Sequence, residues 1–406
     1  MGLSLGTRQR RRAEETLDEL GLLAQSAGAS VVGTELQERP RRDAATLIGR
    51  GKAEQIAEIA REAEASLVVF DEELSPAQQR NLEEILGVKT LDRTQLILDI
   101  FARRASTREG RLQVELAQLQ YFLPRLAGKG VLLSRLGGGI GTRGPGETKL
   151  ETDRRRLRKR IQVVRRDIEG VRRERLTRRE ARRRREVPVV ALVGYTNAGK
   201  STLFNAMSQG DAVVSDQLFM TLDPLVRRVL LGGGRQIMAV DTVGFIQKLP
   251  HALVAAFRAT LEEVVEADLL LHVVDASAPD LEEREAAVES VLDEIGAGER
   301  PRILVLNKSD RVPATRSTAL ARDRSGSVLV SARTGNGVDD LLVALESRLQ
   351  LEPRRVRLHF RRGDRTAISS VYAAGRVLEH EEEGEEVTLQ AELPERLLAR
   401  YRENLR

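Results

Sequence analysis

The sequence predicts a multidomain α/β protein whose central domain has a mostly parallel sheet flanked by helices. Three observations lead to this fold class. Apolar runs of strand length alternate with helical patterns through most of the 406 residues. A glycine-rich loop at 194–202 stands between an apolar run and the start of a helix. Polar residues directly follow three further apolar runs, and parallel sheets bind ligands at the carboxyl ends of their strands.

The composition narrows the class of protein. Hydrophobic residues make up 41% and charged residues 31% of the chain, as in a folded protein with sizeable cores. No apolar run approaches the ~18 residues of a membrane span. The first twelve residues lack an export signal core, so we expect a cytoplasmic location. The absence of cysteine excludes disulfides and thiolate metal sites, and the four scattered histidines do not indicate a metal site.

Residues 1–110 are predicted to form an N-terminal α/β domain. Short strands are expected at 30–33, 67–70 and 88–91, and helices at 52–65, 76–86 and 93–104. Ser75 before Pro76 is typical of a helix N-cap followed by proline. The tetrapeptide Gly-Arg-Gly-Lys at 49–52 resembles part of a phosphate loop, but no Ser or Thr follows it, and we interpret it as a turn.

Residues 111–186 are predicted to form a helical hairpin. Leucines at 112, 116, 119 and 123, and apolar residues at 157, 161, 164, 168 and 171, recur with the spacing of paired helices. The intervening stretch, 136–147, with its glycine-rich loop at 137–146, is predicted to be non-helical. Residues 151–186 hold 16 Arg and one Lys against 7 acidic residues, a net charge of +10.

This charge favours contact with a nucleic-acid backbone. The alternative is a solvated helix stabilised by i,i+4 ion pairs, but a net charge of +10 is more than such pairing requires. Aromatic residues are limited to nearby Tyr121 and Phe122, so phosphates and the shape of folded RNA are favoured over base stacking. The candidate RNA-binding residues are Arg135, Arg143, Lys149, Arg154, Arg155, Arg156, Arg158 and Lys159.

Residues 187–350 are predicted to form a nucleotide domain around the loop Gly194-Tyr-Thr-Asn-Ala-Gly-Lys-Ser-Thr202. In the pattern G-x-x-x-x-G-K-[ST], glycines let backbone N–H groups surround the phosphates, and the next helix directs its positive end at them. Lys200 is expected to contact the β- and γ-phosphates, and the Ser201 hydroxyl to ligate Mg²⁺.

Asn307-Lys-Ser-Asp310, after the predicted strand 302–306, identifies the base. The Asp310 carboxylate can accept hydrogen bonds from N1–H and the exocyclic amine of guanine, and adenine offers neither donor there. Lys308 is expected along the base plane. Asn307 is expected to join this loop to the phosphate loop, and a backbone N–H at 331–332 to meet guanine O6.

Two further segments are predicted to respond to the γ-phosphate. Asp241, after the strand 236–240, can hold Mg²⁺ through water, and the Gly244 amide can donate to the γ-phosphate. Thr221 is predicted to ligate Mg²⁺ only in the GTP state, which makes 219–224 a switch. The candidate catalytic residues are Lys200, Thr221 and Gly244, and the Mg²⁺ ligands are Ser201, Thr221 and Asp241. The candidate GTP-contacting residues are Gly194, Tyr195, Thr196, Asn197, Ala198, Gly199, Lys200, Ser201, Thr202, Phe219, Met220, Thr221, Leu222, Asp223, Asp241, Thr242, Val243, Gly244, Asn307, Lys308, Ser309, Asp310, Ser331, Ala332 and Arg333.

Residues 351–406 are predicted to form a small C-terminal α/β domain. Strands are expected at 356–360 and 386–391, a helix at 394–404, and a solvated acidic turn at 379–386. The segment carries no recognisable catalytic constellation.

Taken together, the chain resembles the HflX family of translation-factor-related GTPases over nearly its whole length. The resemblance rests on a glycine-rich signature at 139–154, the phosphate loop, the segment 219–224, Asp241-Thr-Val-Gly-Phe245 and Asn307-Lys-Ser-Asp310. Lys149 departs from the family, which usually has Gln there. Phe245 stands where many GTPases have a water-orienting Gln, and the family's relatives share this apolar residue.

The resemblance implies a P-loop GTPase domain within a ribosome-associated protein, which we expect to be a monomer. It implies binding to the large ribosomal subunit and its rRNA through the N-terminal domain and hairpin, and splitting of stalled or idle ribosomes. With Phe245 in place of Gln, slow intrinsic turnover and stimulation by the ribosome are expected, and Asn197 raises the option of K⁺ beside Mg²⁺. A large-subunit assembly GTPase is one alternative. A regulatory switch with protein or peripheral membrane partners is another, although the chain lacks a lipidation motif.

Overall fold

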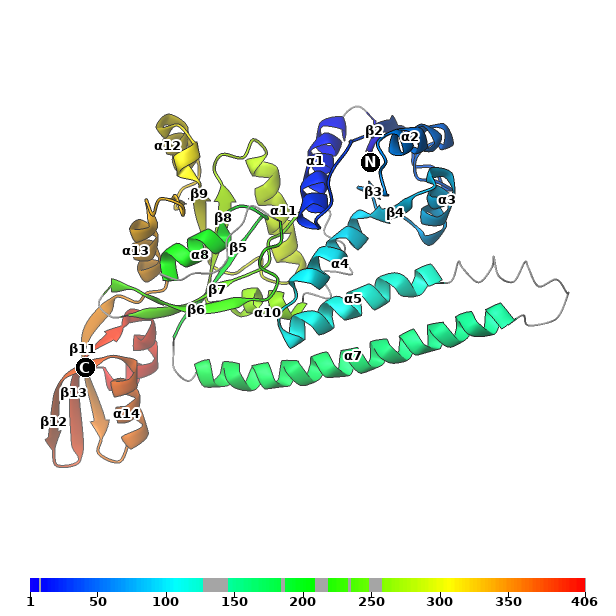
Figure 1. Cartoon of the computed structure of the whole chain (residues 1–406). Helices are drawn as coiled ribbons and strands as arrows, with labels where there is room; N and C mark the ends of the chain where they lie inside the picture. The colour runs from blue at the N-terminus through cyan, green and yellow to red at the C-terminus, as the bar shows by residue number, and fades with distance from the viewer. Residues whose placement is uncertain are drawn as a thin grey trace. The chain divides into compact units, whose positions relative to one another are not determined.

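The computed structural model describes residues 1–6, 9–126, 145–183, 187–208, 218–232, 235–247 and 258–405 (Figure 1). The chain divides into two compact units. The first comprises Met1–Arg173, Val214–Asp223 and Val243–Leu261, and the second comprises Glu174–Val213, Pro224–Thr242 and Glu262–Arg406. Each unit has its own hydrophobic core.

The first unit begins with a parallel α/β fold. Its elements are β1 (Gly2–Leu5), α1 (Arg10–Ser26), β2 (Leu36–Arg39), α2 (Arg50–Glu62), β3 (Leu67–Phe70), α3 (Pro76–Leu86), β4 (Lys89–Asp92) and α4 (Arg93–Arg104). Strand β1 pairs in parallel with β2, and β3 with β4. Met1 joins the two pairs, because its amino group donates to the Val69 carbonyl at 2.8 Å and its carbonyl accepts from the Asp71 amide at 2.9 Å.

The strand predicted at 30–33 is wrong. Val31 and Val32 are 41% and 64% exposed and lie in an unpaired connection between α1 and β2. Two adjacent valines favour a strand only where a partner strand and an apolar surface are available. The turn predicted at 49–52 is also wrong, because Gly49 is the N-cap of α2 and residues 50–52 form its first turn.

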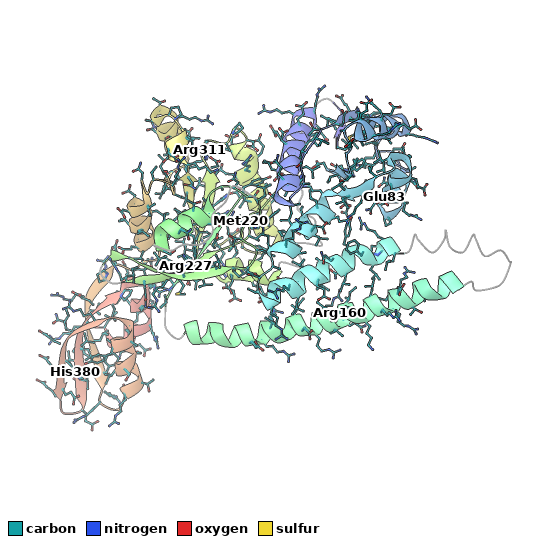
Figure 2. All side chains as sticks on the ribbon, viewed as in Figure 1. Glu83, Arg160, Met220, Arg227, Arg311 and His380 are labelled. Carbon is teal, nitrogen blue, oxygen red and sulfur yellow. The ribbon has the colours of Figure 1, made fainter. Side chains whose placement is uncertain are left out.

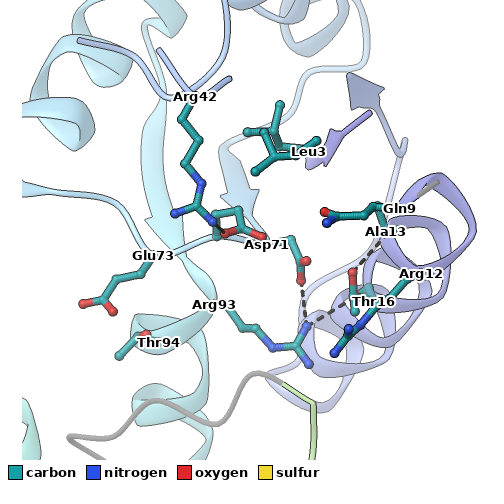
Figure 3. Close-up of a pocket in the computed structure, with 12 residues that line it drawn as sticks. Leu3, Gln9, Arg12, Ala13, Thr16, Arg42, Asp71, Glu73, Arg93 and Thr94 are labelled. Carbon is teal, nitrogen blue, oxygen red and sulfur yellow. Dashed lines mark hydrogen bonds and ion pairs between the residues drawn. The ribbon is translucent and has the colours of Figure 1, made fainter. Parts of the chain in front are cut away.

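A buried ion cluster fixes α1 and α4 to the sheet (Figure 3). Arg93 is only 2% exposed, and its guanidinium pairs with Asp71 and Glu19, each at 2.7 Å. It also donates to the Thr16 carbonyl at 3.3 Å. The cluster borders a cavity of about 420 Å³.

Helices α5 (Arg108–Leu126) and α7 (Pro145–Arg183) form the predicted pair. On α7 the apolar stripe is confirmed, because Ile161 and Val164 are 7% and 0% exposed. On α5 the four predicted leucines are only half-buried, since this helix also packs against α4. Its most buried residues are Gly110, Gln113, Val114, Ala117 and Tyr121.

The predicted non-helical stretch ends earlier than expected. Helix α7 begins at Pro145, so 145–147 are helical; proline is well suited to a first helical position because its φ is preset and no N–H is lost. Residues 127–144, including Arg135 and Arg143, lie outside the described residues.

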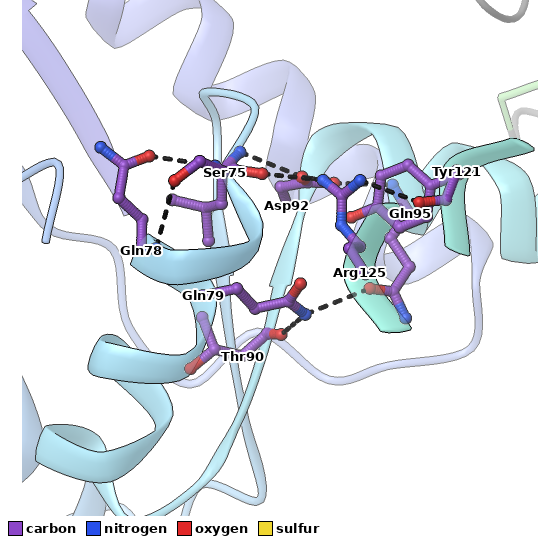
Figure 4. A network of polar contacts seen from close by, with 9 residues as sticks. Ser75, Gln78, Gln79, Thr90, Asp92, Gln95, Tyr121 and Arg125 are labelled. Carbon is purple, nitrogen blue, oxygen red and sulfur yellow. Dashed lines mark hydrogen bonds and ion pairs between the residues drawn. The ribbon is translucent and has the colours of Figure 1, made fainter. Parts of the chain in front are cut away.

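Side-chain caps hold the domain and the hairpin together (Figure 4). The predicted N-cap of α3 is confirmed as a capping box: Ser75 Oγ accepts from the Gln78 amide at 3.2 Å, and the Gln78 side chain accepts from the Ser75 amide at 3.0 Å. Asp92 caps α4 and also accepts from Arg125 of α5 at 3.1 Å. The carboxylate therefore links the α/β fold to the first hairpin helix.

The second unit contains a six-stranded sheet of order β10-β9-β8-β5-β7-β6. Its strands are β5 (Val189–Gly194), β6 (Leu225–Leu230), β7 (Gln236–Asp241), β8 (Leu269–Asp275), β9 (Arg302–Asn307) and β10 (Val328–Leu329). All pair in parallel except edge strand β6, which pairs with β7 in antiparallel orientation. Strand β6 was not predicted from the sequence. The helices are α8 (Lys200–Ser208), α10 (Arg258–Glu266), α11 (Leu281–Glu294), α12 (Ala314–Asp323) and α13 (Val338–Arg348). The mostly parallel sheet flanked by helices is confirmed.

The C-terminal part of this unit is an antiparallel sheet of order β11-β13-β12. Its elements are β11 (Pro353–Arg361), α14 (Arg365–Ala374), β12 (Arg376–Glu383), β13 (Glu386–Pro394) and η4 (Glu395–Asn404). The acidic turn predicted at 379–386 is wrong, because most of it is edge strand β12 and only Gly384 and Glu385 turn. An edge strand can keep its glutamates in solvent. The predicted helix at 394–404 is a 3₁₀ helix kinked at Tyr401.

Candidate functional site

The phosphate loop connects β5 to α8 at the carboxyl edge of the sheet. Gly194 and Gly199 have φ of 151° and 89°, which side chains rarely adopt. A Cβ on Gly194 would lie 2.2 Å from the Val273 carbonyl oxygen, and one on Gly199 would lie 2.3 Å from Asn307 Nδ2. Both positions therefore require glycine for conformation and for space.

Lys200 is the buried cation of this loop, at 6% exposure. Its ammonium donates to the carbonyl oxygens of Gly194 and Tyr195 at 3.0 and 2.9 Å. Burial lowers the pKa of Lys200 to about 8, with Asp241 acting in the opposite direction. An arriving phosphate would supply the anion that stabilises the charged form.

Asp241 and Ser201 form the candidate Mg²⁺ pair. Asp241 ends β7 and is fully buried, and its carboxylate accepts from Ser201 Oγ at 2.7 Å. A hydroxyl and a carboxylate are hard oxygen donors, and Mg²⁺ sites complete such small sets with water and substrate phosphates. The residues present thus fit Mg²⁺ held together with a nucleotide. Among the described residues there is no cluster of three His, Asp or Glu side chains that could hold a metal ion alone.

The predicted link between base loop and phosphate loop is present. Asn307 Nδ2 donates to the Ala198 carbonyl at 2.8 Å, and Asn307 Oδ1 accepts from the Ala332 amide at 3.0 Å. The Ala332 amide, one of the two predicted to meet guanine O6, is engaged in this way here. One side chain therefore joins three loops at the edge of the sheet.

Asp310 and Lys308 are fixed by different partners. Asp310 accepts from the buried Ser331 hydroxyl at 2.7 Å. Lys308 has φ of 61° and pairs with Asp275 at 2.7 Å. Asp275 was missed by the sequence reading, although its place at the end of β8 is the signal that identified Asp241.

Arg284 is a second missed neighbour of the loop. Its guanidinium lies 5.0 Å from the centroid of the Tyr195 ring, and its Nε pairs with Asp280 at 2.8 Å. Arginine over an aromatic face is a favourable contact. Nothing in the local sequence of α11 indicates it, because the contact is made across the fold.

Most of the two segments predicted to respond to the γ-phosphate, 219–223 and 243–244, belongs to the first unit, whereas Pro224, Asp241 and Thr242 belong to the second. Phe219, Leu222 and Asp223 are buried, and Thr221 is half-buried. The Asp223 carboxylate, predicted to contact GTP, accepts hydrogen bonds from Ser106 and Thr107. Gly244 lies in the same unit beside Phe245, which is only 1% exposed.

The predicted RNA-binding residues of α7 lie largely in solvent. Arg155, Arg156, Arg158 and Lys159 are exposed, and Arg154 is half-buried. Lys149 lies within the first turns of α7. Arg160, labelled in Figure 2, forms a bidentate pair with Glu115 of α5 at 2.6 and 2.8 Å. This pair, which the sequence reading did not identify, joins the two hairpin helices.

Three family models match the chain. They are described as GTP-binding GTPase N-terminal, over residues 14–102, GTP-binding GTPase middle region, over 104–182, and 50S ribosome-binding GTPase, over 189–308. Among the described residues, no helix is long and apolar enough to cross a membrane.

Individual relatives cover most of the chain. GTPase HflX of Caldanaerobacter subterraneus is 48% identical over 94% of this chain and 88% of its own. GTPase HflX of Lacrimispora saccharolytica is 44% identical over 99% of this chain and 95% of its own. A GTP-binding protein of Sulfolobus solfataricus, solved in complex with GDP, is 23% identical over 86% of this chain and 97% of its own, with a TM-score of 0.44.

Proposed function

Because the chain belongs to the HflX family of GTPases, we propose that it binds the large ribosomal subunit and splits stalled or idle ribosomes. It hydrolyses GTP to GDP and phosphate, as its family and its P-loop domain indicate. The main support for ribosome binding is the exposed basic face of α7, which lies within a segment of net charge +10. A phosphate-rich RNA surface is its electrostatic complement.

Each residue of the proposed site has a separate role in GTP hydrolysis. Bound Mg²⁺, held by Ser201 and Thr221 with Asp241 acting through water, would neutralise charge that develops between the β- and γ-phosphates. Lys200 adds a second positive charge at the same oxygens. The Gly244 amide donates to the γ-phosphate.

The place of the usual water-orienting glutamine is taken by Phe245, which is buried and has no hydrogen-bonding group. We therefore infer slow intrinsic hydrolysis, stimulated when the ribosome supplies the missing alignment. Asn197, with a φ of 59° in the loop, is our candidate for holding K⁺ near the phosphates.

The domain boundaries that we propose follow these roles. An N-terminal domain to about residue 110 and the hairpin to 186 contact rRNA, and the GTPase domain spans 187–350. We propose that the protein acts as a cytoplasmic monomer.

The test is sedimentation with purified ribosomes through a sucrose gradient, comparing a non-hydrolysable GTP analogue with GDP. We expect co-migration with the large subunit and loss of intact ribosomes in the GTP-like state only. Binding to free large subunits without loss of intact ribosomes would replace splitting by an assembly role. Absence of ribosome binding in both states would reject the proposal in favour of protein or membrane-surface partners.

Charge reversal on α7 separates RNA contact from folding. We expect the triple variant Arg154→Glu, Arg155→Glu, Arg156→Glu to lose ribosome binding and to keep basal hydrolysis. Few acidic residues are available to pair with these arginines, since residues 151–186 hold 7 acidic and 17 basic residues. Equal loss of binding and hydrolysis would mean that the helix serves folding alone.

A further inference from the structure

The segment 218–223, which carries the proposed Mg²⁺ ligand Thr221, is docked in the first unit against the start of the hairpin. We propose that Asp223 is a nucleotide-dependent cap of α5, and that GTP binding is transmitted to the hairpin through this carboxylate. The inference rests on the proposed role of Thr221 and adds a regulatory connection to it.

Four hydrogen bonds hold the Asp223 carboxylate. Oδ2 accepts from the Ser106 amide at 2.9 Å, from the Ser106 hydroxyl at 2.7 Å and from the Thr107 amide at 2.8 Å. Oδ1 accepts from the Thr107 hydroxyl at 2.5 Å. These donors lie immediately before α5, next to its positive dipole end. The Thr107 hydroxyl itself accepts from the Gly110 amide in the first turn at 3.0 Å, so Asp223 holds the local cap in place. In this sense the carboxylate is a second cap, supplied from more than 100 residues away in the sequence.

The ionisation of Asp223 agrees with this geometry. Burial alone would raise its pKa, since the residue is only 9% exposed. The hydrogen bonds from Thr107 and Ser106 outweigh that effect, and the pKa of Asp223 lies below its ordinary value. The cap is thus charged at neutral pH.

A second anchor lies on the other side of Thr221. The Phe219 ring meets the Phe101 ring of α4 edge to face, with centroids 4.7 Å apart, and both side chains are buried. The Leu218 amide donates to the Ser26 hydroxyl at 3.0 Å. The segment is therefore held at both ends, with Thr221 between the two anchors.

Gly110 shows how closely Asp223 fits against α5. A Cβ added to Gly110, in the first turn of α5, would lie 2.2 Å from Asp223 Oδ1. Its backbone is helical, so conformation alone does not require glycine there. The absence of a side chain instead makes room for the carboxylate.

Chain length makes the cap sensitive to nucleotide. Thr221 and Asp223 are two residues apart, which an extended chain spans in about 7 Å. GTP orders Thr221 on Mg²⁺ and so keeps Asp223 on α5, whereas hydrolysis releases both. By linkage, any partner that stabilises the capped hairpin raises affinity for GTP relative to GDP.

The test uses two glycine-to-alanine variants of the full chain. Gly110→Ala displaces Asp223, while its Cβ meets the Thr107 hydroxyl at 3.3 Å and alanine favours helix over glycine. Gly170→Ala in α7 is the matched control, because a Cβ there meets nothing within 4 Å. Ser106→Ala, which removes one of the four bonds, gives a milder second variant. Neither Gly110 nor Ser106 is among the proposed nucleotide-binding residues.

Hydrogen exchange of the peptide 105–112 is measured by mass spectrometry with a GTP analogue and with GDP. In the wild-type chain and Gly170→Ala we expect the analogue to slow exchange about fivefold relative to GDP, the effect of a cap worth about 1 kcal/mol. We expect Gly110→Ala to abolish this difference and Ser106→Ala to reduce it, with nucleotide affinity measured in parallel. Equal exchange with both nucleotides in the wild type, or an unchanged difference in Gly110→Ala, would overturn the inference. Because no ribosome is present, failure of ribosome binding leaves the result unaffected.

Discussion

Replacing Asp310 by Asn changes the charge that selects guanine and little else. In the proposed complex the carboxylate accepts two N–H donors from the base, and hydrogen bonds to a charged group contribute about 1.5–3 kcal/mol each. Their loss corresponds to about 3–6 kcal/mol, or roughly 10²- to 10⁴-fold weaker GTP binding. The loop itself should persist, because Asn307 keeps its bonds to the Ala198 carbonyl and the Ala332 amide. Asp310 is exposed, so the fold tolerates the change.

The assay is equilibrium titration with GTP and with XTP. Xanthine has a carbonyl where guanine has the exocyclic amine, so the side-chain amide introduced by the substitution can donate to it. We expect the Asp310→Asn variant to lose GTP affinity and to gain XTP affinity at an unchanged melting temperature. GTP binding within about threefold of wild type would refute guanine recognition by Asp310, since that is far below the loss expected for two charged hydrogen bonds. Loss of both nucleotides with a lower melting temperature would instead indicate a structural role.

Three further predictions follow from single groups. Burial lowers the pKa of Lys200 from 10.5 to about 8, so GTP affinity should fall as the pH rises above about 8. The nucleotide-free fold should gain stability between pH 8 and 10.5, because there it binds fewer protons than the unfolded chain. A GTP affinity that stays constant across that pH range would contradict this. Arg93→Met should cost about 3–5 kcal/mol in urea unfolding, because Asp71 and Glu19 would lose the buried guanidinium that pairs with both of them. Arg10→Met, in an exposed pair, is the control that should cost far less. Hydrolysis should slow when Na⁺ replaces K⁺, and equal basal and ribosome-stimulated rates in the two salts would remove the K⁺ role of Asn197.

Local signals in the sequence located most of the fold. The start of the α3 helix was predicted because Ser75 and Pro76 form a local signal that needs no distant partner, and in the structure Gln78 completes the capping box. The strand that ends at Asp241 was found because a buried run is followed by a polar residue at the carboxyl edge. The strand predicted at 30–33 failed where pairing with distant residues decides the outcome: β1 and β2 pair with each other, and Val31 pairs with no strand.

The same distinction holds for the candidate site. The phosphate loop and the base loop are contiguous motifs, and their residues could be named from spacing alone. The pair between Lys308 and Asp275 could not, because the two residues meet only after β8 and β9 align in parallel. Arg284 over Tyr195 likewise depends on how α11 packs, and its sequence resembles any solvated helix.

Asp223 illustrates why such distant contacts are suited to carry a signal. A cap provided by a neighbouring residue, such as Ser75 on α3, forms whenever the helix forms and cannot report on anything else. A cap provided by a separate segment can be gained or lost while the helix persists, and capping is worth about 1 kcal/mol. That amount shifts an equilibrium about fivefold, which is within the ordinary range of coupling between two sites. The start of α5 has a local cap in Thr107 and an acidic residue in Glu109, and Asp223 adds a second carboxylate from the segment that we expect to respond to GTP.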